Sequence, residues 1–149
     1  MFSVFKRKGP QHVDVYKEVI TQEYHGIDHR NLSQGSLKVI EVLQHAGHEA
    51  YLVGGGIRDL LLRKHPKDFD VATSAKPMEV QKLFKRSRLI GRRFQIVHVR
   101  IGAEIIEVTT FRGSTSNNKL RRANASGMLV RDNVFGSVED DAVRRDFTM

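Results

Sequence analysis

The pattern of apolar and polar positions changes at residue 33. Residues 1–32 show no convincing period, and we predict that they form an N-terminal arm. From Ser33 onward, apolar residues recur at the i, i+3, i+4, i+7 spacing of an amphipathic helix. Ser33 can cap the start of this helix, and Gly47 can end it. The apolar stripe consists of Val39, Val42, Leu43 and Ala46.

Shorter strand-like and helix-like segments alternate after this helix. Gly102 and Ala103 separate two apolar segments and indicate a β-hairpin, and the polar segment 112–126 predicts a loop. The alternation predicts an α/β or α+β fold with a small mixed sheet and flanking helices, in one domain over 33–149. We expect strands over 49–53, 67–73, 96–101 and 105–111, and helices over 57–62, 77–85 and 139–145.

The composition excludes several classes of protein. The chain has 149 residues and no cysteine, which rules out a disulfide scaffold, a thiolate zinc site and a cysteine nucleophile. The lack of cysteine fits a reducing compartment, and we expect a cytoplasmic protein. No apolar run approaches the roughly 20 residues that a membrane-spanning helix needs.

The charge indicates the kind of partner. Lys and Arg number 25 against 17 Asp and Glu, a formal net charge of +8, and such an excess favours polyanions. Between Lys82 and Arg100 lie seven basic residues and no acidic one. The run fits RNA contact, in particular at Arg92 and Arg93. It also fits a solvated helix face and an edge strand.

A glycine-rich turn follows one predicted strand and opens a helix. Gly54, Gly55 and Gly56 let the backbone turn sharply and let a ligand approach the amides, and Arg58 adds a bidentate phosphate donor. A helix N-terminus favours anions, so the turn is a candidate phosphate site. A tight strand–helix connection alone also explains it, and the spacing is not that of a P-loop.

Two aspartates occupy alternate positions nearby. If Asp68 and Asp70 lie on a strand, they share one face, and two carboxylates there repel unless a cation lies between them. Mg²⁺ held by one or two carboxylates together with substrate phosphates is the usual solution, with Mn²⁺ as an alternative ion. A pair of surface aspartates near a turn is the competing interpretation.

The combination favours phosphoryl or nucleotidyl transfer. The glycine turn and the aspartate pair are separated by one short helix, and Glu107 on a later strand offers a third acid. Two or three carboxylates that hold Mg²⁺ beside a nucleotide suit an in-line displacement at phosphorus. Glu107 can equally form a buried salt bridge. Asp141 is spaced to form ion pairs with Arg144 and Arg145 on a helix, while an arginine of this pair can instead reach a nucleotide.

Four motifs occur in order along the chain: GGGIRDLLL, PKDFDVAT, EVTTFR and EDDAVRRDFT. Together they resemble the head domain of the family of bacterial poly(A) polymerases and CCA-adding tRNA nucleotidyltransferases. The resemblance implies a polymerase-beta-like nucleotidyltransferase head. It also implies that the chain stops before the neck domain that selects the base, so we expect a fragment of a longer protein.

The resemblance also implies roles for single residues. Asp68 and Asp70 correspond to metal-binding acids, Glu107 to the third acid, and Asp146 to an acid counted with the catalytic site. Nucleotide contacts correspond to Gly55, Arg58 and Arg145.

The segment 89–99 and the run GMLVRDNVFGSVEDDA resemble the polymerase branch of the family. That branch adds AMP from ATP to RNA 3′ ends without a template, in mRNA polyadenylation. CCA addition to tRNA is the alternative, and a non-catalytic RNA-binding module is the second alternative.

Overall fold

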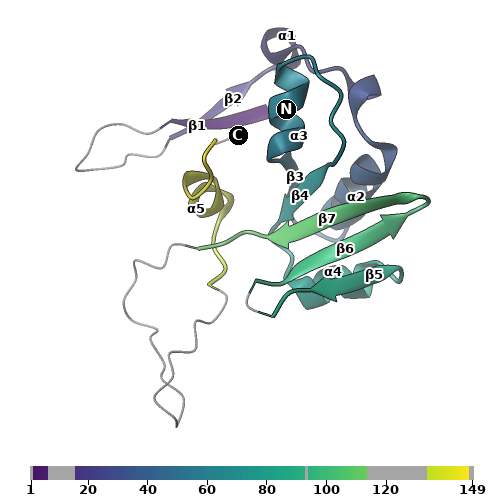
Figure 1. Cartoon of the computed structure of the whole chain (residues 1–149). Coiled ribbons are helices and arrows are strands. Elements are labelled where there is room, and N and C mark those ends of the chain that lie inside the picture. Colours follow the sequence, from purple (N-terminus) through teal and green to yellow (C-terminus); the bar gives the residue numbers. More distant parts are fainter. Residues whose placement is uncertain (1, 7–15, 93, 114–133, 148–149) are drawn as a thin grey trace.

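A mixed five-stranded sheet forms the centre of the computed structural model, which describes residues 2–6, 16–92, 94–113 and 134–147 (Figure 1). The strand order is β3-β4-β7-β6-β5, in which β4 and β7 run parallel and the other neighbours antiparallel. This arrangement confirms the predicted fold class. The strands are β3 (Ala50–Val53), β4 (Asp70–Thr73), β5 (Ser87–Ile90), β6 (Ile96–Ile101) and β7 (Glu104–Thr110).

Two helices, α2 (Gln34–His45) and α4 (Pro77–Leu83), pack on one face of this sheet and bury its core. Side chains alternate across a strand, so every second residue of each strand contributes to this apolar layer. The buried cluster consists of Val39, Leu43, Ala50, Val71, Ala75, Val80, Phe84, Val97, Val99, Ile106 and Val108.

The ends of α2 agree with the sequence prediction. The Ser33 hydroxyl accepts a hydrogen bond from the Ser36 N–H at 3.0 Å, and Gly47 adopts φ 86° just beyond the last turn. The His48 N–H then bonds to the Leu43 carbonyl at 3.0 Å, which closes the helix. Ala46, predicted as part of the apolar stripe, is exposed because it caps the helix.

The strand that carries the second candidate motif is shorter than predicted. Helix α3 (Gly55–Leu61) directly follows β3, and β4 begins at Asp70 rather than at residue 67. Asp68 therefore precedes the strand.

The predicted helix over 139–145 is α5 (Val138–Val143), and most of the predicted loop 112–126 lies outside the described residues.

The first 32 residues contain secondary structure that the sequence pattern did not indicate. Strands β1 (Phe2–Lys6) and β2 (Tyr16–Ile20) pair antiparallel, and α1 (Gln22–His25) and the short 3₁₀ helix η1 (His29–Asn31) follow. Helix α5 contacts β1 (Figure 1). The domain boundary at residue 33 stays a prediction. Of the helices that the structure describes, none has the length and apolarity needed to cross a membrane.

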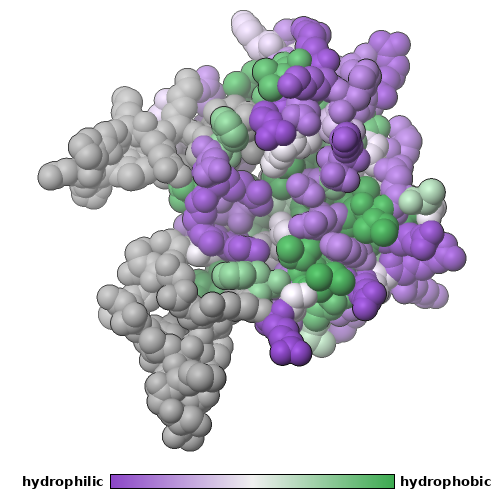
Figure 2. All heavy atoms as spheres, in the orientation of Figure 1, coloured by the Kyte–Doolittle hydropathy of each residue, from purple (hydrophilic) through white to green (hydrophobic). Residues whose placement is uncertain are grey.

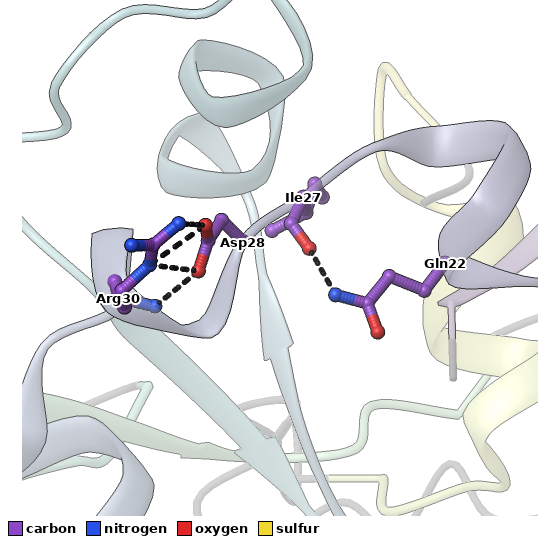
Figure 3. A network of polar contacts seen from close by, with 4 residues as sticks. All are labelled: Gln22, Ile27, Asp28 and Arg30. Atoms are coloured by element: carbon purple, nitrogen blue, oxygen red, sulfur yellow. Dashed lines mark hydrogen bonds and ion pairs between the residues drawn. The ribbon is translucent and has the colours of Figure 1, made fainter.

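A local ion pair fixes the start of η1 (Figure 3). The Asp28 carboxylate accepts from the Arg30 backbone N–H at 2.8 Å and from the Arg30 guanidinium at 2.6–3.2 Å. Just before it, the Gln22 side-chain amide donates to the Ile27 carbonyl at 3.2 Å. The hydrogen bonds from Arg30 lower the pKa of Asp28 to about 2.

This pair predicts a defined acid response. The pKa of Asp28 is lower in the folded than in the unfolded chain, so its stabilising effect is complete above about pH 4 and is lost as the pH falls toward 2. We expect the Asp28 carboxyl to titrate near pH 2 in a ¹³C NMR titration. Arg30→Ala removes the side-chain hydrogen bonds but keeps the backbone N–H, so it should raise this pKa part of the way toward the ordinary value of 3.8. An unchanged titration in that variant would contradict the assigned cause.

Candidate active site

One row of side chains crosses the sheet on the face opposite the core. Asp70 on β4 lies directly beside Glu107 on β7, and Glu107 lies opposite His98 on β6. The row continues to Val53 at one end and to Arg88 at the other. Residues opposite each other in neighbouring strands point to the same face, so the row places two acids and two basic residues on one surface.

A cavity of about 230 Å³ lies over the acidic end of this row. Its lining combines two carboxylates from the sheet with an acid and two arginines from the C-terminal segment. The lining residues are Val53, Asp70, Ile96, Glu107, Thr109, Arg112, Asp141, Arg144 and Arg145.

The glycine turn lies against one of these carboxylates. Gly54 adopts φ 75° and ψ −150°, and a Cβ atom there would lie 3.2 Å from Asp70 Oδ2. Both the positive φ and the close approach require glycine. Gly56 has a different reason, because a Cβ there would lie 3.1 Å from the Asp68 carbonyl oxygen. The structure thus brings the turn and Asp70 together, as the short connecting helix predicts.

Asp70 carries a charge in an unfavourable environment. Burial raises the pKa of its carboxyl above the ordinary value, and the Glu107 and Asp68 carboxylates raise it further. Arg145 opposes this rise. Such a half-buried carboxylate with acidic neighbours is suited to a cation.

The three acids predicted as metal ligands are not assembled into one cluster. Asp68 is exposed and does not line the cavity, whereas Asp70 and Glu107 do. In the parts of the chain that the structure describes, no three His, Cys, Asp or Glu side chains are grouped closely enough to hold a metal ion. Two carboxylates still suit Mg²⁺, which takes most of its ligands from water and substrate phosphates.

Arg145 is held in place by a buried acid. Its guanidinium pairs with Asp141 at 2.8 Å, and Asp141 is 6% exposed. The second Asp141 oxygen accepts the Arg112 backbone N–H at 3.0 Å. Of the two predicted ion pairs of Asp141, the one with Arg145 is present and the salt bridges among the described residues do not include one with Arg144. Asp141 also connects α5 to the end of β7. Asp146 is exposed and does not line the cavity.

Arg58 does not face this cavity. Its guanidinium pairs with Asp59 at 2.8 Å, about half of its side chain is exposed, and it lies near the backbone of Gly55. Arg92 is exposed, and Arg93 lies outside the described residues.

Sequence reasoning missed two further contacts. His98 Nε2 lies 3.7 Å from Glu107 Oε2, and the Arg112 guanidinium lies 4.4 Å from the centre of the half-exposed Phe94 ring. The hairpin turn carries the signal for the first contact. A two-residue turn pairs residues at equal distances on its two sides, and that rule places Glu107 opposite His98.

The chain resembles a known class of enzyme structure. It matches a Bacillus stearothermophilus CCA-adding enzyme, solved in complex with CTP, with a TM-score of 0.58 and 36% identity over 76% of this chain and 25% of that one. The fold is therefore that of a nucleotidyltransferase head.

Sequence comparison identifies the family. Residues 50–149 match the family described as Poly A polymerase head domain. The chain is 56% identical to Poly(A) polymerase I of Salmonella typhi, over 88% of this chain and 29% of that protein. It is 44% identical to the CCA-adding enzyme of Bacillus cereus, over 74% and 26%. The chain belongs to the poly(A) polymerase head-domain family, and it spans under a third of the length of these relatives.

The charge on Asp70 predicts a stability change with a counter-intuitive sign. A carboxyl whose pKa is higher in the folded chain destabilises that fold once the pH exceeds its unfolded value. Asp70→Asn keeps the shape and removes the charge. We expect it to raise the free energy of unfolding at pH 7, in urea denaturation with EDTA, and to leave it nearly unchanged at pH 3. Destabilisation at pH 7 would show that Asp70 is a structural acid.

Proposed function

We propose that this chain is the catalytic head of a polynucleotide adenylyltransferase, which adds AMP from ATP to RNA 3′ ends without a template. The observation that carries this function is the position of Asp70. It lies beside Glu107, opposite the Gly54 turn, in a cavity that Arg145 also lines. The family supports the same reaction, since relatives at 56% identity are poly(A) polymerases.

The donor set fits Mg²⁺. Asp70 and Glu107 offer hard oxygen ligands, Asp68 lies close enough to raise the pKa of Asp70, and no described cation pairs with the Asp70 carboxylate. Asp70 and Glu107 would hold Mg²⁺ or Mn²⁺, and Asp68, which lies outside the cavity, would have to move toward them to add a third ligand. When bound, the ion supplies charge neutralisation at the phosphates and lowers the pKa of the attacking hydroxyl.

The chain's own residues position the nucleotide and balance its charge. Arg145, fixed by Asp141, offers a guanidinium to the nucleotide without a further loss of side-chain freedom. The Gly54–Gly56 amides and Arg58 would contact the phosphates, for which Arg58 must exchange Asp59 for the ligand. Asp146 would orient this C-terminal segment from outside the cavity.

The proposed reaction is an in-line displacement at phosphorus. The RNA 3′ oxygen attacks the α-phosphorus of ATP, the bond from that phosphorus to the bridging oxygen breaks, and pyrophosphate leaves. The hydroxyl proton passes to solvent. The protein mainly positions the groups and stabilises charge.

In the full-length protein, Asp70→Asn should lower AMP transfer by about 10³-fold, since it removes a charge from the reacting centre. The measurement is extension of a labelled oligoadenylate with ATP and Mg²⁺. Asp28→Asn is the matched control, because this partly exposed acid lies outside the cavity. Retained turnover in Asp70→Asn would reject the metal assignment.

A separate measurement tests the alternative of a non-catalytic RNA-binding module. Mg²⁺-independent ATP binding, in wild type and in Asp68→Ala, would favour that alternative.

CCA addition remains a second candidate, because the matched solved structure is a CCA-adding enzyme and a relative at 44% identity is another. Incorporation of CTP and of ATP on a tRNA-like primer separates the two. We expect the full-length protein to use ATP repeatedly and to discriminate against CTP. Ordered addition of two C residues and one A would replace polyadenylation with CCA addition. A cytoplasmic location belongs to either proposal.

A further inference from the structure

The sheet face that holds Asp70 extends beyond the cavity onto β5 and β6, where it is basic. Arg88 on β5 and Arg100 on β6 alternate with Leu89, Val97 and Val99, which pack against the core. Both arginines therefore lie on the face opposite the helices. His98 on β6 lies opposite Arg88, and Arg100 follows it two residues later on the same face of that strand.

No described element covers this part of the face. Ile105, two residues before Glu107 on β7, is 61% exposed, whereas α2 and α4 pack on the other side (Figure 1). Figure 2, in the same orientation, shows hydrophilic residues interspersed with apolar ones on the viewed face. This surface is open to a ligand.

The charge on the surface is unbalanced. Arg88, Arg92 and Arg100 are exposed, and no carboxylate in the described parts of the chain forms an ion pair with any of them. The side chain of Arg100 contacts only a backbone carbonyl, that of Gly102, among the described hydrogen bonds. An open set of arginines attracts phosphate groups.

The surface connects directly to the reacting centre. Arg88, His98, Glu107 and Asp70 are successive neighbours across four strands. With strands about 4.8 Å apart, the Arg88 and Asp70 backbones are about 14 Å apart. A chain of phosphates bound at Arg88 can thus extend to the carboxylates.

An aromatic ring lies where this surface meets the cavity. Phe94 is 50% exposed, and it stacks with Arg112, which lines the cavity. Arginines that follow a backbone, together with an exposed aromatic ring that can stack on a base, are the usual means of binding single-stranded nucleic acid.

We propose that Arg88, Arg92, Phe94 and Arg100, here called the β5–β6 basic face, bind the single-stranded RNA whose 3′ end enters the cavity. The RNA backbone lies along the arginines, and one of its last bases stacks on Phe94. The inference rests on the proposed function, since it takes RNA as the substrate. The glycine turn lies at the other end of the sheet, so ATP and RNA approach the carboxylates from opposite sides.

The test uses the full-length protein and a 5′-fluorescein-labelled oligoadenylate, with binding followed by anisotropy in EDTA so that no reaction occurs. The double variant Arg88→Ala/Arg100→Ala should raise the Kd about tenfold, and it should lower the slope of log Kd against log salt by about 1.4, or about 0.7 for each lost phosphate contact. Phe94→Ala should weaken binding, and Phe94→Tyr should restore it. Lys82→Ala is the matched control, because Lys82 belongs to the same basic run but lies on α4.

The outcomes separate this face from the proposed function. If wild type binds RNA and transfers AMP while the double variant keeps the wild-type Kd and thermal stability, the basic face is rejected and the function stands. If the variant weakens RNA binding but wild type transfers no nucleotide, the face is retained and the function is rejected. A higher KM for ATP with an unchanged Kd for RNA would overturn the proposal and assign the face to the nucleotide.

Discussion

The functional arrangement depends on the parallel pairing of β4 with β7. This pairing puts Asp70 directly beside Glu107, and two like charges at that distance repel each other in a half-buried position. Arg145 offsets only part of the repulsion, because its guanidinium is already paired with Asp141. The fold therefore keeps an electrostatic penalty at one point of the sheet, which a bound cation can remove.

The apolar layer beneath the sheet maintains this unfavourable contact. Val71 and Val108, the neighbours of Asp70 and Glu107, are almost fully buried against α2 and α4. A shift of one residue in either strand would turn a carboxylate into the core and a valine out to water. Burial of a valine stabilises by about 1.5–3 kcal/mol, so the packing sets the register against the charge repulsion.

Much of this could be predicted from the sequence, and the reasons for the rest are physical. The Ser33 cap, the Gly102 turn and the mixed sheet follow from local patterns of residues. The β1–β2 pair does not, because its two short segments lack a strong alternation of apolar and polar residues. The isolation of Asp68 was not predicted either, since strand alternation says nothing about where a strand begins. Leu62, the last residue of the helix predicted over 57–62, caps α3 instead and is 58% exposed.

The sheet also separates two kinds of electrostatic environment along one row. At the β3 end, the Gly54 turn lies against the Asp70 carboxylate, so that a Cβ atom on Gly54 would lie 3.2 Å from its oxygen. At the β5 end, Arg88 has no carboxylate partner among the described residues. Polyanions avoid the first environment unless a cation is present, and they are attracted to the second in any case. Under the proposed function, RNA would therefore bind the β5–β6 basic face without a cation, whereas a triphosphate beside the carboxylates would need one, so the cation would control binding of the nucleotide alone.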